Sequence, residues 1–512
     1  MSAAGVAAGR PMPDIHPAPP LALGGHAALA EAAWMGSPQA SDVLEPLRIA
    51  APRWRPAQMR LPSLGSLLTR ELSVAEASAV LMGAFFASAL LGAVRQALLN
   101  AQFGAGPQAS AYYAAARLPE VLFSLVAGGA LSSAMIPVLL GTVRENGEAA
   151  GVRLVRVTLT ALLAVFAIVT LAALLVAPWF VRSVLAPGFD AATQELTVGL
   201  TRVMLLQPLI LAAGSVATAV LNSRNQFVLT ALALLSHNLA VIGGVLLARA
   251  VPSLGIYGPA LGVVAGGALQ LCILLPGLLA RGYRLRPAWA PSDPRLGAIA
   301  QLLIPNGLSV GVNYAGTILD TAFASLTAEP AGLAALTNAW MLAGLPIALL
   351  GQAVGQSAFP RLAAQAEAQS WRAFRRTLTW SLAAAVLLAI PAVGGLLLLG
   401  RPTIALIFER GLFDASAGDL TFRLLAIYAV ALPCYVATEV LTRGLVALRD
   451  TRTPLATNSA QIAGRAALLA VLVPRLGVAA VPLAFAATSA LESAVLLAAL
   501  MLRLRRASTP TA

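Results

Sequence analysis

Several charged side chains of this sequence fall inside long apolar segments. Arg95, Arg117, Glu120 and Asp320 are the candidate ligand-binding residues among them. Placing a charge in hydrocarbon is costly unless the group is paired or faces water, so such a residue marks a functional site by default. Arginine suits a phosphate-bearing ligand, because its planar guanidinium makes paired hydrogen bonds to phosphate oxygens.

Structural roles are open for the same residues. Arg117 and Glu120 are three residues apart, on one face of a helix, where they can form an ion pair. Arg95 and Arg117 also lie near one end of their segments, where a long side chain can reach the membrane surface. A ligand-binding role and an interfacial role are about equally favoured for these two arginines.

Four more charges lie in the last third of the chain. Glu439 and Arg443 are four residues apart, so we expect them to pair with each other. Arg465 and Glu492 fall in successive apolar segments and are candidates for a pair between helices. These four residues are expected to be structural.

The usual signatures of soluble enzymes are missing from the sequence. It contains no Walker A, HExxH or GxSxG pattern, and its histidines and cysteines are too scattered for a metal site: His16, His26, His237, Cys272 and Cys434. We therefore predict no catalytic residue, no metal, no cofactor and no nucleic-acid partner. Any pumping would draw on an ion gradient or on the membrane potential.

The composition is that of a polytopic membrane protein. Hydrophobic residues make up 59% of the chain and charged residues 11%, with a mean hydropathy of +0.82, whereas soluble domains are roughly a quarter charged. A transmembrane helix needs about 20 apolar residues. The apolar runs predict an all-α fold of twelve transmembrane helices, at 78–100, 110–140, 156–181, 194–222, 227–250, 256–280, 298–325, 333–360, 374–399, 417–446, 454–474 and 478–502.

The arginines indicate how these helices cross the membrane. The loops 101–109, 251–255 and 326–332 contain none, whereas the sixth loop contains Arg281, Arg284, Arg286 and Arg295. Basic residues stay in the cytoplasm. The pattern predicts that both termini are cytoplasmic.

The order of the segments predicts four regions. Residues 1–75 are rich in alanine and proline and are expected to be a disordered cytoplasmic extension. Residues 76–282 and 283–503 would form two lobes of six helices, and 504–512 a cytoplasmic tail.

The two lobes carry an internal repeat at an offset of 224 to 225 residues. Phe189-Asp190-Ala191 recurs as Phe413-Asp414-Ala415. We expect Asp190 and Asp414 to cap helices and not to form a catalytic pair. Parallel repeats around a central cleft are typical of alternating-access transporters. Residues at repeat or turn positions are candidates for structural or gating roles: Gly92, Pro137, Asn222, Asn225, Pro360, Arg449 and Asp450.

Residues 88–139 also carry a family resemblance. The matching elements are Leu91-Gly92 with Arg95, Phe103-Gly104-Ala105-Gly106, Ala111 to Tyr113, Arg117-Leu118-Pro119, Gly129-Ala130 and Pro137. This stretch resembles the first two helices of the MurJ-type lipid II flippases, the MviN family of the MOP exporter superfamily. The similarity extends along nearly all of residues 78–503.

The resemblance implies a flippase of the bacterial cytoplasmic membrane that serves cell-wall biogenesis. It would carry undecaprenyl-pyrophosphate-linked peptidoglycan precursor, lipid II, from the inner to the outer leaflet through a MATE-like cleft, and cell-wall synthesis proteins are possible partners. Arg95 and Arg117 would hold the pyrophosphate. Several charges of the family pattern are replaced here, by Ala89, Ser110, Phe123, Gly128 and Met341.

Two other functions fit the sequence. One is export of another polyprenyl-linked glycan or of an amphipathic molecule, which the replaced charges favour. The other is a membrane scaffold that transports nothing, with the N-terminal extension as a partner-binding segment.

Overall fold

The computed structural model describes residues 72–127, 130–283 and 286–508, all within one compact unit, Ser63–Ala512. The predicted extension 1–75 lies outside these residues except for its last four. Within them the regular structure is helical throughout. That follows from the sequence, because a backbone in hydrocarbon must satisfy its own hydrogen bonds.

The first half of the described chain has ten helical elements. They are α3 (Val74–Phe103), α4 (Pro107–Ala127), α5 (Ala130–Asn146), α6 (Glu148–Phe180), η2 (Val181–Leu185), α7 (Ala191–Met204), α8 (Leu206–Ser223), α9 (Phe227–Ala250), η3 (Pro252–Leu254) and α10 (Tyr257–Ala280).

The second half repeats the arrangement. Its elements are α11 (Pro294–Ser325), α12 (Gly332–Pro346), η4 (Ile347–Gln352), α13 (Ala353–Glu367), α14 (Trp371–Ile407), α15 (Ala415–Ala447), α16 (Arg452–Leu476), η5 (Gly477–Ala479) and α17 (Ala480–Ser508).

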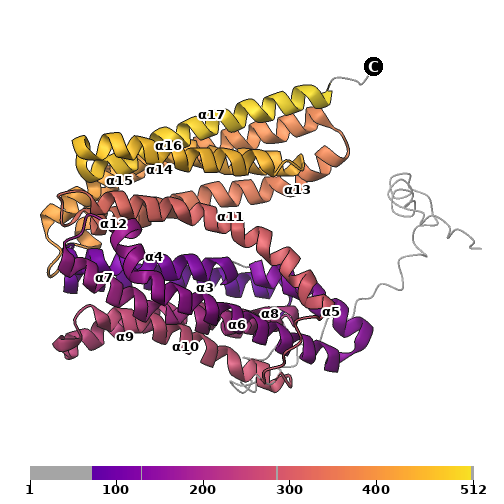
Figure 1. Ribbon diagram of the computed structural model, residues 1–512. Coiled ribbons are helices and arrows are strands. Elements are labelled where there is room, and N and C mark those ends of the chain that lie inside the picture. Colours follow the sequence, from indigo (N-terminus) through magenta and orange to yellow (C-terminus); the bar gives the residue numbers. More distant parts are fainter. Residues whose placement is uncertain (1–71, 128–129, 284–285, 509–512) are drawn as a thin grey trace, which may run out of the picture. The chain divides into compact units, whose positions relative to one another are not determined.

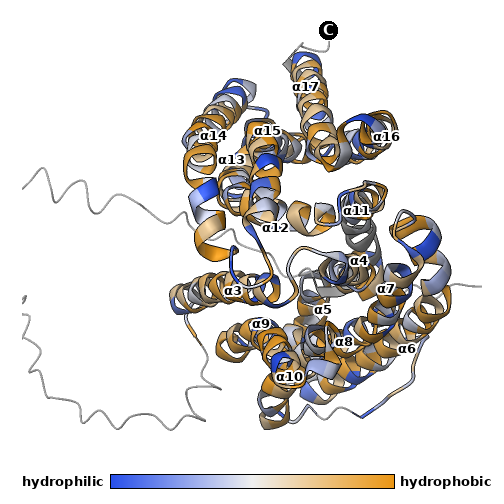
Figure 2. Ribbon diagram, turned by 90° about the vertical axis from the view of Figure 1, so that its left-hand side faces the viewer, coloured by the Kyte–Doolittle hydropathy of each residue, from blue (hydrophilic) through white to orange (hydrophobic). Residues whose placement is uncertain are grey.

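The predicted fold class is confirmed. Among the described residues, nine segments are long and apolar enough to cross a membrane, and one of them, Arg452–Arg506, holds both α16 and α17. Another, Leu131–Leu185, holds most of α5 together with α6. When α16 and α17 are counted separately, α5 is counted with α4 and not with α6, and α11 is added, the helices correspond to the twelve predicted spans. Hydrophobic residues run along all of these helices (Figure 2).

The helices form two lobes. α3–α10 form the first lobe and α11–α17 the second, with α11 running along the boundary between them (Figure 1). α11 packs against α4 and α5 of the first lobe and against α16 of the second. α11 therefore contacts helices of both lobes.

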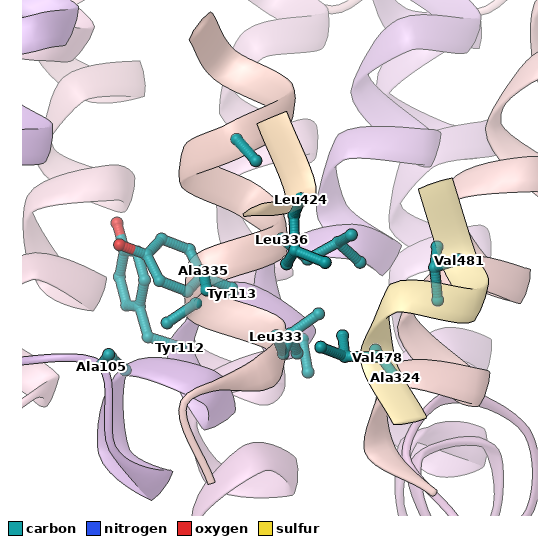
Figure 3. Close-up of a cluster of buried hydrophobic side chains, with 14 of the residues drawn as sticks. Ala105, Tyr112, Tyr113, Ala324, Leu333, Ala335, Leu336, Leu424, Val478 and Val481 are labelled. Atoms are coloured by element: carbon teal, nitrogen blue, oxygen red, sulfur yellow. The ribbon is translucent and has the colours of Figure 1, made fainter. Parts of the chain in front are cut away.

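Three clusters of buried hydrophobic residues show where the lobes are joined. The largest cluster takes residues from both lobes, among them Tyr113 and Leu333 (Figure 3). The buried residues of the second cluster lie between 122 and 299 and those of the third between 358 and 504. The shared cluster lies beside the loops 104–106, 186–190, 326–331 and 408–414, which together we call the closed end. At the opposite end the third cluster belongs to the second lobe alone, and the second cluster belongs to the first lobe except for Ile299 of α11.

Asp190 and Asp414 cap helices, as the sequence predicted. Asp190 accepts hydrogen bonds from the backbone N–H groups of Ala192 and Thr193, at 3.1 and 3.2 Å, and begins α7. Asp414 accepts from Ala417 N at 2.9 Å and begins α15. The Thr193 hydroxyl lowers the pKa of Asp190, and the Ala417 N–H lowers that of Asp414. Both carboxylates therefore accept hydrogen bonds from backbone N–H groups at the start of a helix.

The predicted structural residues divide between turns and helix contacts. Asn225 and Arg449, 224 positions apart, both adopt left-handed backbone conformations, with φ of 57° and 59°. Asp450 accepts a hydrogen bond from Thr453 N at 3.0 Å and pairs with Arg503 at 2.8 Å. These residues form matching turns at the end opposite to the closed end.

The remaining members of that set lie in helices. Gly92 faces Asn238 of α9, whose side-chain amide donates to Ser88 O at 3.0 Å. Pro137 and Pro360 lie inside α5 and α13, and Asn222 lies in the last turn of α8. Their expected role in gating stays a prediction.

Candidate functional site

A buried ion pair lies between two helices of the second lobe. Asp320 of α11 accepts a hydrogen bond from the Arg465 guanidinium of α16, and the two side chains are 13% and 7% exposed. Arg465 Cζ also lies 4.9 Å from the centroid of the Phe485 ring. The expected pairing of Arg465 with Glu492 is wrong, because Asp320 reaches Arg465 from the neighbouring helix. Asp320 is thereby neutralised within the protein.

Arg117 connects the two lobes. Its Nε donates to Thr321 Oγ1 of α11 at 3.2 Å, and its Nη2 lies 3.5 Å from Thr337 Oγ1 of α12. Its Nη1 is 3.2 Å from Glu120, which confirms the predicted pair within α4. The Arg117 side chain is only 17% exposed. These bonds cross the seam between the lobes, so they must break if the lobes separate there.

A chain of buried polar side chains crosses the same seam. Gln96 of α3 donates at 2.5 Å to the Tyr113 hydroxyl and to Asn338 Oδ1 of α12, and the Tyr113 hydroxyl donates to Asn100 Oδ1 at 3.2 Å. The Nδ2 groups of Asn100 and Asn338 are buried without a partner among the described residues. An unpaired buried donor costs about 1–3 kcal/mol. These two unpaired donors make the contact between the lobes less stable than it would be with every donor paired. A contact of limited stability fits an interface that has to open.

The sequence pointed to only part of this seam. Gln96 is the repeat counterpart of Asp320, at an offset of 224, and that correspondence was the one available signal. Thr321, Thr337 and Asn338 are neutral residues with ordinary neighbours, so nothing in the sequence marked them as partners of Arg117 and Gln96.

Arg95 differs from the other arginines described so far. It is half-buried on α3, and its charge acts on Tyr112 and on His237 of α9. Among the described residues it has neither an ion-pair partner nor a hydrogen-bond acceptor. In a membrane-spanning helix, a half-buried guanidinium without a partner marks a candidate site for an anion. Arg95 therefore stays a candidate residue for binding an anionic ligand.

The expected pair Glu439–Arg443 is not formed. No ion pair joins these two residues of α15 within the part of the chain that the structure describes. A Cβ built on Gly351 of η4 would lie 3.3 Å from Glu439 Cγ, and one built on Gly355 of α13 would lie 3.1 Å from Arg443 Nε. The two side chains pack against these neighbouring elements, and that packing takes the place of a direct pair.

The described residues contain no group of three or more histidine, cysteine or acidic residues that could hold a metal ion. His237 is hydrogen-bonded to Gln207 at 3.1 Å. Besides the paired carboxylates of Glu120 and Asp320, the side chains described above at the seam are arginines, amides and hydroxyls. Arginines and other hydrogen-bond donors of this kind can bind an anion.

A protein-family model described as "Lipid II flippase MurJ" matches residues 99–510. The chain belongs to this family. A relative described as a probable lipid II flippase MurJ, from Rhizobium tropici, is 29% identical over 426 residues, which cover 82% of this chain and 80% of the relative.

Two solved structures share the fold of this MurJ-family chain. One is described as lipid II flippase MurJ in an inward closed conformation, with a TM-score of 0.69, 21% identity, and coverage of 84% of this chain and 90% of that one. The other is a multidrug resistance MATE family transporter of the MOP superfamily in an inward-facing conformation, with a TM-score of 0.71, 14% identity, and coverage of 83% and 96%. The two-lobed, MATE-like architecture that the repeat and the family resemblance together led us to expect is confirmed.

The positions at which this chain departs from the MurJ pattern lie in varied surroundings. Ser110 is buried and donates to Pro330 O at 3.2 Å, across the seam. Met341 packs at the edge of the shared hydrophobic cluster. Ala89 is exposed and Phe123 is half-buried, whereas Gly128 lies outside the described residues. At Ser110 and Met341, seam packing thus takes the place of the charge that the family resemblance leads one to expect.

Proposed function

We propose that this chain is a flippase that carries lipid II from the inner to the outer leaflet of the bacterial cytoplasmic membrane. Membership of the MurJ family over residues 99–510 is the observation that carries the proposal. The unpaired Arg95 supports it, because a pyrophosphate supplies the anion that this guanidinium lacks.

The proposed mechanism is alternating access. The lobes share a hydrophobic core at the closed end and have largely separate cores at the other, so one end opens while the other is shut. Arg95 binds the pyrophosphate. Arg117 also binds the pyrophosphate once its bonds to Thr321 and Thr337 have broken. Glu120 positions Arg117, and Asp320 acts through Arg465 on the architecture of the second lobe.

The proposal includes an orientation and an energy source. With the arginine-rich loops in the cytoplasm, both termini are cytoplasmic, the closed end faces the periplasm and the structure is inward-facing. The chain catalyses no covalent chemistry and uses no cofactor, and the membrane potential or an ion gradient drives the cycle. Cell-wall synthesis proteins are proposed as partners.

A related cargo is the second candidate. Seam packing replaces charge at Ser110 and Met341, which leaves fewer groups for a pyrophosphate. Another polyprenyl-linked glycan with a smaller anionic linkage would need fewer cations. A non-transporting scaffold is less favoured, because it gives no reason to keep an unpaired half-buried arginine.

Binding by the purified protein separates these functions. We expect lipid II and undecaprenyl pyrophosphate to bind at least about tenfold more tightly than undecaprenyl monophosphate, since each added charge-assisted bond contributes about 1.5–3 kcal/mol. Native mass spectrometry of the detergent-solubilised protein measures this. Equal affinity for the pyrophosphate and for uncharged undecaprenol would refute the proposal, and preference for the monophosphate would favour the second candidate.

A further inference from the structure

One loop of the first lobe is seated on the second lobe at the closed end. The loop 186–190, between η2 and α7, places Gly188 against the last turn of α11. Gly188 N donates to Ser325 Oγ at 3.2 Å. A Cβ at Gly188 would collide with the Ser325 carbonyl oxygen and with Leu326 Cα. Only glycine allows the loop to approach the helix end this closely.

A loop of the second lobe is seated on the first lobe in the same way. The loop 408–414, between α14 and α15, places Leu412 on the last turn of α3. Leu412 N donates to Ala101 O at 2.9 Å. A Cβ at Gly411 would collide with the Ala101 carbonyl oxygen, and one at Gly104 would lie 2.7 Å from Leu412 O.

The two contacts are related by the internal repeat. Adding 224 to Gly188 gives Leu412, and adding 224 to Ala101 gives Ser325. In both, a backbone N–H of a loop in one lobe donates to the end of the first long helix of the other lobe. The repeated Phe-Asp-Ala motifs span the end of each loop and the start of the next helix, and Asp190 and Asp414 fix the loops by capping that helix. The duplicated motif and the reciprocal contacts are thus one feature.

We propose that these contacts are a pair of reciprocal latches that hold the closed end shut, and that they release together when the lobes rock. This inference rests on the proposed alternating-access function. Each latch is a loop rigidly capped at its own end and weakly bonded to the other lobe. The weak bond breaks first when the lobes separate, so the loops move with their own lobes.

The first latch can be opened by adding bulk at Gly188. The test uses whole cells that express the full chain with Cys272→Ala and Cys434→Ala, and with a single reporter, Thr337→Cys, beneath the seam. A membrane-impermeant maleimide is added from outside. We expect Gly188→Val to raise the labelling rate by about tenfold or more, because overpacking opposes closure. Ser325→Ala removes the hydroxyl that accepts from Gly188 N and donates to Ala322 O within its own helix, and it should raise the rate about fivefold.

Gly106→Val is the matched control, because a Cβ at Gly106 meets nothing within 4 Å. In a parallel set of variants, the exposed Ala328→Cys replaces Thr337→Cys as the single reporter and shows whether the closed end faces outwards. Joining Ala101→Cys to Leu412→Cys with a short bifunctional maleimide should return the Gly188→Val reporter to the control rate. The proposal would be overturned if Gly188→Val and Ser325→Ala were labelled no faster than Gly106→Val. It would also be overturned if the cross-linked Gly188→Val protein were still labelled fast.

The readout is accessibility, so it does not depend on the cargo. If the latch variants label as expected but the chain carries no lipid II, the latches stand and only the proposed cargo fails. If the chain carries lipid II but the reporter stays unlabelled in Gly188→Val and Ser325→Ala, the latch proposal fails and the proposed function stands. Size-exclusion profiles identify any variant that is misfolded, and Ser325→Ala adds no bulk that could prevent folding.

Discussion

Arg465→Ala is expected to lower the free energy of unfolding by about 3–5 kcal/mol. The substitution leaves Asp320 charged, buried and without its partner, and Asp320 Oδ1 already has no hydrogen-bond donor among the described residues. It also removes the cation that lies over the Phe485 ring. Unfolding in mixed micelles, followed by tryptophan fluorescence, measures the change.

Two variants show whether the ion pair is responsible. Asp320→Leu combined with Arg465→Met removes both charges and should recover most of the lost stability, because a well-packed apolar pair often replaces a buried ion pair at little cost. Arg475→Ala removes an exposed arginine of the same helix and should change stability by less than about 0.5 kcal/mol. If the single and double variants were equally unstable, Asp320 would not be the partner that matters.

Arg95→Ala is expected to act in the opposite way, on binding and not on stability. Since Arg95 has no partner in the described structure, its removal breaks no internal bond. Losing its charge-assisted bonds to a pyrophosphate should weaken lipid II binding by about 10- to 150-fold. Titration of the purified protein with lipid II gives the affinity, and unfolding in micelles gives the stability.

Arg95→Lys and Arg202→Ala refine this prediction. Lysine keeps the charge without the planar fork, so it should recover only part of the affinity. Arg202 is an exposed arginine on α7, and its removal should leave binding unchanged. Unchanged binding in Arg95→Ala, or a loss equal to that of Arg202→Ala, would show that Arg95 is an interfacial residue only.

The fold could be predicted because its determinants are local in sequence. Apolar runs of spanning length placed all twelve segments, and the repeat at an offset of 224 indicated two lobes. The side-chain partners could not be predicted in the same way. Spacing along one helix predicted Arg117–Glu120 correctly, but the same rule failed for Glu439–Arg443, whose side chains pack against η4 and α13 and form no ion pair with each other.

Contacts between helices depend on how the lobes meet, which no local pattern contains. Arg465 lies closer in sequence to Glu492 than to Asp320, yet α11 and α16 pack together and bring Asp320 to it. The partners of Arg117 are hydroxyls of Thr321 and Thr337 from the other lobe. Neutral residues of this kind can be identified as hydrogen-bond partners only once the structure shows both sides of the seam.

The most direct test is to express this chain in a bacterium depleted of its own lipid II flippase and to measure lipid II in the outer leaflet. The account predicts survival and restored outer-leaflet lipid II, with both lost in Arg95→Ala and retained in Arg202→Ala. Failure to restore outer-leaflet lipid II by protein shown to be inserted and abundant would contradict the account and assign the chain another cargo.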